Sequence, residues 1–315
     1  MLPSHDTWNP AALPDQTGKR FVVTGGNAGL GYFAAEQLAA AGASVVLASR
    51  SPQKAQLALE AIRAAVPGAR VSFVRLDLAD LSTVPPAAEE LRAEAIDGLV
   101  ANAGILGART RGETADGFEL MFGTNHLGHA ALIAELLPTL AATPDSRIVH
   151  LGSIAHRFER LDFADLQSEK YRSFRSYCRS KLAVMLFAFE LDRRLREAGS
   201  GIRSLVAHPG YSVDELSPAR AGVVPERPNP VIRTALGGFA QGKDAGAWPV
   251  ARAMTDPAAA GGDYWGPGGW EQLRGAPALV TTKPHARDPE TAARLWRATE
   301  RLLDRAIDIP RSTAA

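Results

Sequence analysis

One glycine-rich turn sets the class of fold: Thr24-Gly25-Gly26-Asn27-Ala28-Gly29-Leu30-Gly31. It stands between a short apolar run at 20–24 and a segment of helical period at 30–41. Glycines let the chain turn tightly and bring backbone N–H groups close to a pyrophosphate, which the N-terminus of the following helix also attracts. Such a turn alone is a weak signal, but its place between a strand and a helix favours a dinucleotide site over a merely tight turn.

The chain beyond this turn alternates short β-branched runs with longer segments of helical period. Several runs are almost continuously apolar, as strands buried on both faces should be. The pattern predicts an α/β fold: a single doubly wound parallel sheet of Rossmann type, with about seven strands and with helices on both faces. The predicted strands are Arg20–Thr24, Ser44–Ala48, Arg70–Leu76, Gly98–Ala101, Arg147–Leu151 and Ile202–Ala207. The predicted helices are Leu30–Ala41, Pro52–Val66, Thr83–Glu94, Asn125–Leu140, Ser176–Ala198 and Pro289–Ala306.

Two of these helices, at 125–140 and 176–198, are apolar around more of their circumference than a surface helix needs. One face of each would pack on the sheet. The second face would pack either on a partner subunit, which would make a homodimer or higher homo-oligomer, or on other parts of the same chain. Both interpretations stay open at the level of the sequence.

The domain organisation is predicted to be simple. A chain of 315 residues with 46% hydrophobic and 22% charged residues is long enough for one large core and short for two enzymatic domains. We expect an extended N-terminal arm at 1–18 and one domain at 19–315. Beyond Pro209, prolines and glycines break the periodic segments. Residues 212–270 are therefore predicted to be a variable region that forms the substrate lid, chiefly at 214–230.

The charge balance favours small-molecule partners. With 35 basic and 34 acidic residues the net charge is +1, which gives no field to recruit nucleic acid or an anionic membrane. No apolar run is long enough for a membrane span, and the single cysteine, Cys178, suits a reducing compartment, so we expect a cytoplasmic protein. His126 and His129 have a spacing that suits a metal, but no third ligand is evident, so no metal site is predicted.

The end of the second predicted strand reads Ala48-Ser49-Arg50 and has no carboxylate for the ribose hydroxyls of NAD(H). The Arg50 guanidinium can pair with a 2'-phosphate, and Ser49 can add a hydroxyl. The alternative for Arg50 is a solvated arginine at a strand end. The missing acid favours NADP(H) over NAD(H).

A candidate catalytic pair, Tyr177 and Lys181, stands four residues apart on a predicted helix, so the two side chains share one face. An ammonium beside a phenol favours the phenolate and would lower the tyrosine pKa from about 10, which makes Tyr177 a usable general acid and base. Ser153, after the fifth strand, could hydrogen-bond the same substrate oxygen. The alternatives are an exposed surface pair, a serine that ends its strand, and an N-cap role for Asn125.

These residues and their order resemble the classical short-chain dehydrogenase/reductase family. Gly25, Gly29 and Gly31 match its TGxxxGxG turn, and Asn125, Ser153, Tyr177 and Lys181 match its catalytic set. The resemblance implies that Lys181 binds the nicotinamide ribose and that Asn125 holds a water that relays protons through it. Asp77 and Leu78 match the pair that contacts adenine in this family, so adenine contacts are expected there. Residues 102–104 match the family's NAG signature, and a Pro-Gly pair follows the sixth predicted strand as it does in the family. The cofactor contacts expected are Gly25, Asn27, Gly29, Leu30, Gly31, Ser49, Arg50, Asp77, Leu78, Asn102, Ala103, Gly104, Tyr177, Lys181, Pro209, Gly210 and Ser212.

Twenty-four positions separate Ser153 from Tyr177, more than the family usually has, and 155–174 should hang over the site. Together with the motifs at 116–119, 125–129 and 180–183, this segment resembles the branch of retinol dehydrogenases and the WW-domain oxidoreductase. Where the family often has a threonine for the nicotinamide carboxamide, either Ser212 or Asp214 stands here. The apolar walls of the pocket are expected from Phe158, Tyr211, Trp265 and Trp270.

The resulting hypothesis is an NADP(H)-dependent oxidoreductase that moves a hydride between nicotinamide and a hydrophobic carbonyl compound or a secondary or primary alcohol. One alternative is a catalytically weak NADP(H)-binding interaction or sensor protein on the same fold, since a fold alone does not establish activity. Another is a dehydratase or epimerase on the same scaffold.

Overall fold

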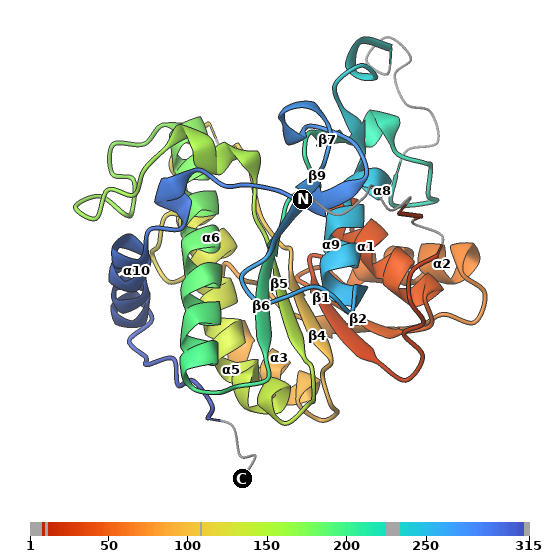
Figure 1. The fold of residues 1–315 in the computed structure, drawn as a ribbon, viewed down its shortest axis with the longest axis horizontal. Helices are drawn as coiled ribbons and strands as arrows, with labels where there is room; N and C mark the ends of the chain where they lie inside the picture. Colours follow the sequence, from red (N-terminus) through yellow and green to blue (C-terminus); the bar gives the residue numbers. More distant parts are fainter. Residues whose placement is uncertain (1–7, 10–11, 108, 225–233, 312–315) are drawn as a thin grey trace.

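The computed structural model describes residues 8–9, 12–107, 109–224 and 234–311 (Figure 1). The predictions for the start of the N-terminal arm at 1–7 and 10–11, and for the part of the lid at 225–230, lie outside the described residues.

The centre of the molecule is an eight-stranded sheet in the order β10-β9-β6-β5-β4-β1-β2-β3. Neighbouring strands are parallel from β3 to β9, and β10 alone is antiparallel at the edge. The predicted parallel sheet is confirmed, with one strand more than expected. Its strands are β1 (Arg20–Thr24), β2 (Ser44–Ser49), β3 (Arg70–Arg75), β4 (Gly98–Ala101), β5 (Arg147–Leu151), β6 (Arg203–Ala207), β9 (Tyr264–Pro267) and β10 (Pro277–Leu279).

Helices cover both faces of the sheet (Figure 1). Val22 and Val23 are consecutive in β1, both are completely buried, and they belong to the two different hydrophobic cores. This explains why the strands read as continuous apolar runs. One face carries α1 (Gly29–Ala40), α2 (Pro52–Ala65) and α9 (Trp248–Thr255), and the other carries α3 (Val84–Leu91), α5 (Gly128–Ala141), α6 (Ser173–Glu197) and α10 (Pro289–Leu302).

The second face of α6 packs on α10 of the same chain. The Phe187 and Trp296 rings stack with centroids 5.0 Å apart, and the Arg194 guanidinium lies 4.4 Å from the Trp296 ring centroid. His126 reaches the same helix through Thr299, with Nε2 and Oγ1 2.8 Å apart. Of the two interpretations of this apolar face, the structure therefore supports contact within the chain at these residues.

The helix that carries Asn125 begins earlier than predicted. Helical residues start with α4 (Leu120–Phe122), pass through a π-helical turn at Gly123–Leu127 and continue as α5. Asn125 is therefore inside the helical segment, and the N-cap alternative for it is wrong. A π-turn leaves backbone carbonyls out of the regular ladder and often marks a functional position.

Candidate active site

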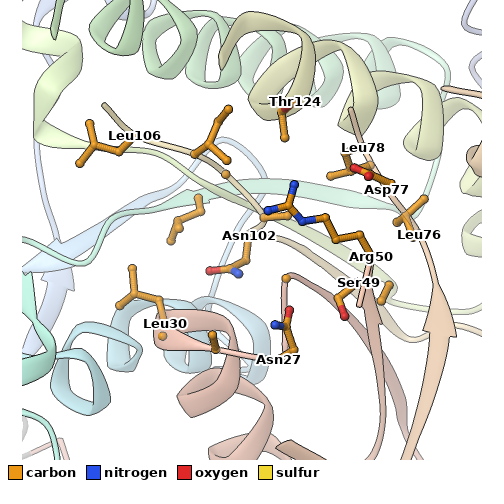
Figure 2. Close-up of a pocket in the computed structure, with 18 of the residues that line it drawn as sticks. Asn27, Leu30, Ser49, Arg50, Leu76, Asp77, Leu78, Asn102, Leu106 and Thr124 are labelled. Carbon is orange, nitrogen blue, oxygen red and sulfur yellow. The ribbon is translucent and has the colours of Figure 1, made fainter. Parts of the chain in front are cut away.

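A cavity of about 540 Å³ opens at the carboxyl ends of β1 and β4, where the strand order reverses from one half of the sheet to the other (Figure 2). Ligands of doubly wound sheets bind at this topological switch point. Most of the predicted site residues line the cavity. They are Gly25, Asn27, Gly29, Leu30, Ser49, Arg50, Asp77, Leu78, Asn102, Ala103, Gly104, Tyr177 and Lys181.

The glycine-rich turn is packed so tightly that side chains are excluded. A Cβ on Gly31 would lie 2.4 Å from Asn102 Nδ2 and 2.5 Å from the Gly25 carbonyl oxygen. Asn102 Nδ2 in turn donates to the Thr24 carbonyl oxygen at 2.8 Å. Gly31 thus lies beneath the cavity, where it lets the turn and the end of β4 approach each other.

The end of β1 is tied to the segment that follows β4. Thr24 Oγ1 accepts hydrogen bonds from the backbone N–H groups of Asn102 and Ala103, at 2.9 and 3.0 Å. The same oxygen lies 2.8 Å from Nε2 of His129, which is buried in α5. Two walls of the cavity and the helix that follows Asn125 therefore share one hydroxyl group.

The end of β2 supplies positive charge to one end of the cavity. Figure 2 shows the Arg50 side chain extending from this strand toward the middle of the cavity. Two neighbours that the sequence did not predict, Ser51 and Lys54, also line it. Asp77 lines the cavity too, and its Oδ1 accepts a hydrogen bond from the backbone of Ala79.

The cavity also contains buried hydroxyl groups without hydrogen-bond partners among the described residues. Ser49 Oγ and Thr124 Oγ1 both line it, and both side chains are more than nine-tenths buried, but no described residue bonds either oxygen. Buried polar atoms of this kind normally find a partner, so they indicate a polar ligand at this place. Together with the cations and the glycine-rich turn, they fit a phosphate-bearing dinucleotide.

At the other end of the cavity stand the predicted catalytic residues. Lys181 is 5% exposed and its Nζ donates to the Leu151 carbonyl oxygen at 2.9 Å. Burial lowers the pKa of Lys181 to about 8. Tyr177 makes a side-chain hydrogen bond with Ser153, which follows β5. The four-residue spacing in α6 therefore brings the phenol and the ammonium to one side of the cavity, as predicted.

The expected direction of the Tyr177 pKa shift is wrong for the protein alone. The pKa of Tyr177 is raised, first because burial disfavours the phenolate, while the hydrogen bond with Ser153 acts in the opposite direction. The protein's own groups thus keep the phenol protonated.

Asn125 joins the cavity wall to α6. Its Oδ1 accepts from the backbone N–H of Ile105 at 2.8 Å, and its Nδ2 donates to Ser180 Oγ at 2.9 Å. A Cβ on Gly104 would lie 3.1 Å from Asn125 Oδ1 and 3.6 Å from Lys181 Nζ, so only a glycine leaves this corner open. The Asn125 carbonyl oxygen is bonded by His129 Nδ1 at 2.9 Å.

Four predicted cofactor contacts are absent from the cavity lining: Gly31, which lies beneath it, and Pro209, Gly210 and Ser212. The Ser212 hydroxyl donates to the Pro209 carbonyl oxygen at 2.7 Å, so a backbone group within this segment uses its proton. Asp214 is bound by Lys243, whose Nζ lies 2.6 Å from Asp214 Oδ2. Lys243 lines the cavity, which the sequence did not predict.

The four aromatic residues expected to wall the substrate pocket divide into two groups. Trp265 is buried in the sheet core, and Arg252 lies 4.9 Å from its ring centroid, so the prediction that it walls the pocket is wrong. Phe158, Tyr211 and Trp270 are exposed, and none of the three is among the residues that line the cavity.

Among the residues that the structure describes, no group of three or more His, Cys, Asp and Glu side chains could hold a metal ion. None of the described helices combines the length and the apolar character that crossing a membrane requires.

Comparisons with known proteins agree with this geometry. A family model for short chain dehydrogenases matches residues 19–218. Human retinol dehydrogenase 13 is 41% identical over 203 residues, which cover 63% of this chain and 60% of that protein. Mouse polyprenol dehydrogenase is 37% identical over 300 residues, which cover 92% of this chain and 85% of that protein.

A solved structure, that of an uncharacterized protein from Mycobacterium Paratuberculosis, is 35% identical and superposes with a TM-score of 0.79 over 96% of this chain and 99% of that one. The chain therefore belongs to the short-chain dehydrogenase family and is similar to its retinol dehydrogenase-like branch.

Proposed function

We propose that this protein is an NADP(H)-dependent oxidoreductase that interconverts a carbonyl compound and an alcohol, with Tyr177 as general acid and base. One observation carries the proposal: one cavity is lined both by the glycine-rich turn and by Tyr177 and Lys181, and Ser153 is hydrogen-bonded to the phenol. A dinucleotide held by the turn would present its nicotinamide to these groups.

The chemistry assigned to the chain's own residues follows from their protonation. The nicotinamide supplies or takes the hydride when it is bound. Tyr177, which burial keeps protonated, donates its phenolic proton to the oxygen of a carbonyl substrate as negative charge develops there. Ser153 donates a hydrogen bond to the same oxygen and stabilises that charge. In the reverse direction Tyr177 accepts the proton of the alcohol.

Lys181 helps to return a proton to Tyr177 after the phenol has donated its own, and it positions the cofactor. Its pKa of about 8 leaves the ammonium charged at neutral pH, and its bond to the Leu151 carbonyl oxygen fixes the side chain. It lies on the same side of the cavity as the phenol, where it can bind ribose hydroxyls. Asn125 holds Gly104 and Ile105 against α6 and so keeps this end of the cavity open.

The proposed preference for NADP(H) rests on the charges at the end of β2. Arg50 and Lys54 line the cavity beside the unpartnered Ser49 hydroxyl. A guanidinium, an ammonium and a free hydroxyl group are the donors that a 2'-phosphate requires. We expect NADPH to bind more tightly than NADH, and equal binding would contradict this part of the proposal.

The substrate is proposed to be apolar. Phe158 and Phe174 contact each other with ring centroids 5.9 Å apart, and both stay exposed in the segment after Ser153. Tyr211 stacks on Phe239 in the segment after β6, and both are also exposed. Two relatives are named for apolar alcohols, retinol and polyprenol. Exposed apolar side chains beside a site favour an apolar ligand.

A substrate panel tests the proposal. The wild-type protein is mixed with NADPH and a series of ketones and aldehydes of increasing chain length, and then with NADP⁺ and the matching alcohols. We expect oxidation of NADPH by long-chain apolar carbonyl compounds. Turnover confined to small charged compounds would contradict the substrate class, and binding of NADPH without any turnover would support the interaction-protein alternative.

A further inference from the structure

Lys243 brings a positive charge to the glycine-rich turn from a distant part of the sequence. It is the first residue of α8 (Lys243–Gly246), and its side chain lines the cavity. A Cβ on Gly29 would lie 3.3 Å from Lys243 Nζ. Because Gly29 is the first residue of α1, the ammonium lies beside the helix N-terminus that the turn opens.

The backbone around Lys243 is held by several contacts. A small parallel ladder pairs β7 (Ser212–Val213) with β8 (Gln241–Gly242). The Lys243 N–H donates to Ser217 Oγ at 2.8 Å, and Gln241 Nε2 donates to the Pro209 carbonyl oxygen at 2.9 Å. These contacts therefore fix the backbone position of Lys243 within the segment that follows β6.

The charges of the cavity are unbalanced. Among the described residues that line it, four are cationic and Asp77 alone is acidic. The partner of Lys243, Asp214, is not part of the lining, and its side chain is about half exposed. An ion pair at such an exposed site contributes little to stability, so exchanging its carboxylate for another anion costs little. The cationic residues are Arg50, Lys54, Lys181 and Lys243.

These cations occupy different parts of the cavity. Arg50 and Lys54 follow β2, Lys181 stands at the catalytic end, and Lys243 lies at the glycine-rich turn. The N-terminus of α1 offers backbone N–H groups to a phosphate, but it supplies only a partial charge. A full positive charge beside Gly29 would complete a site for a dianionic group.

We propose that Lys243 binds the pyrophosphate of the dinucleotide and that it exchanges the Asp214 carboxylate for phosphate oxygens when the dinucleotide binds. The inference rests on the proposed function, since it concerns the same cofactor site. No covalent bond forms or breaks in this exchange. Lys243 thus joins the segment after β6 directly to the bound cofactor.

The first test compares two dinucleotides that share the pyrophosphate and differ in the 2'-phosphate. NADPH and NADH are titrated into the wild type, Lys243→Met and Arg50→Met, with Lys283→Met as a control that removes an exposed lysine outside the cavity. Loss of a charge-assisted contact weakens binding by about tenfold or more. We expect Lys243→Met to weaken both dinucleotides alike and Arg50→Met to weaken NADPH alone. A Lys243→Met protein that binds both normally, or that loses NADPH selectively, would overturn the inference.

The second test uses the partner of Lys243. We expect Asp214→Asn to bind both dinucleotides several-fold more tightly, because the lysine no longer has a competing carboxylate, and Lys243→Arg to retain most of the affinity. If the ion pair only braced the segment after β6, Asp214→Asn would weaken binding as Lys243→Met does, and the inference would fail. Both variants remain informative if Lys243→Met does not fold.

Binding and turnover separate this inference from the proposed function. Wild-type binding of NADPH without turnover of any carbonyl compound would remove the proposed reaction and leave the Lys243 inference in place. Wild-type protein that binds neither dinucleotide would overturn both. Normal turnover with unchanged affinities in Lys243→Met would overturn the Lys243 inference alone.

Discussion

His129 Nε2 lies 2.8 Å from Thr24 Oγ1, at the centre of a chain of hydrogen bonds behind the cavity. The Asn125 carbonyl oxygen can only accept, so His129 Nδ1 carries the proton of that bond. Burial lowers the pKa of His129 to about 4, so at neutral pH Nε2 is bare and accepts the Thr24 hydroxyl proton. Thr24 Oγ1 then accepts from the Asn102 and Ala103 backbones.

Replacing Thr24 by Val tests this chain of contacts. The valine leaves His129 Nε2 and the Ala103 backbone N–H without a partner, while the Asn102 N–H keeps its bond to the Val100 carbonyl oxygen. The two unpaired groups cost about 2 to 4 kcal/mol of unfolding free energy. Because Asn102 and Ala103 line the cavity, NADPH affinity should fall as well. Urea unfolding and NADPH titration measure the two effects. Thr24→Ser keeps the hydroxyl and is the matched control, and equal stability of the valine and serine variants would contradict the account.

Acidification should destabilise the protein between about pH 6.5 and pH 4. The pKa of a histidine in an unfolded chain is near 6.5, so the unfolded chain binds protons on acidification. The buried imidazoles of the folded protein stay neutral, and the folded state therefore loses stability relative to the unfolded chain. Each contributes a loss of roughly 1 kcal/mol by pH 5.5. Buried carboxyls with a raised pKa, such as Glu119, act in the opposite sense. Burial lowers the pKa of His126, His150 and His208 to about 3, and of His129 and His156 to about 4.

The measurement is the free energy of unfolding in urea at pH 7.5, 6.5 and 5.5. We expect a steady fall across this series. A constant value from pH 7.5 to 5.5 would contradict this prediction. It would mean that the imidazoles take up protons in the folded protein as readily as in the unfolded chain.

Gly31→Ala should damage the cofactor site through packing alone. The added methyl group would lie 2.4 Å from Asn102 Nδ2 and 2.5 Å from the Gly25 carbonyl oxygen, so Asn102 or the turn must move. Overpacking of this kind costs about 1 to 3 kcal/mol, and NADPH affinity should fall with it. Gly201→Ala is the matched control, because a Cβ at Gly201 meets no atom of the described residues within 4 Å. Normal NADPH affinity in Gly31→Ala would contradict the geometry of the turn.

Trp296→Ala should show how strongly α10 holds α6. The indole is fully buried between Phe187 and Arg194, and its removal leaves a large cavity that costs about 3 to 5 kcal/mol. Arg297→Ala, at an exposed position of the same helix, should change stability by less than about 0.5 kcal/mol. Chemical denaturation of both variants measures the difference. If Trp296→Ala were as stable as the wild type, α10 would not be packed on α6 as described.

The sequence predicted the parallel part of the sheet well because those strands are buried on both faces. Val22 and Val23, for example, are consecutive residues that pack in two different hydrophobic cores. The strands near the carboxyl end gave no such pattern. Trp265 and Gly266 belong to β9, a strand that contains glycine and proline and forms only against β6 and β10. The residue pattern of β9 therefore predicts a loop, because the strand depends on pairing with other strands and not on its local sequence.

The positions of Tyr177 and Lys181, the proposed catalytic pair, were predictable for a similar reason, since local spacing places both side chains on one face of a helix. Lys243 was not, because the β7–β8 ladder brings it to Gly29 across more than two hundred residues. Thr124 was also missed. It lies in the π-helical turn, whose geometry no pattern of apolar residues indicates.

The central claim is that Tyr177 donates the proton to the substrate and does not hold the cofactor in place. The most direct measurement compares Tyr177→Phe with the wild type for NADPH affinity and for the rate of carbonyl reduction. General acid catalysis contributes about a hundredfold to ten-thousandfold in rate, so we predict a loss of at least that size with NADPH affinity within about threefold of the wild type. A Tyr177→Phe protein that reduces the same carbonyl compound at the wild-type rate would contradict the account.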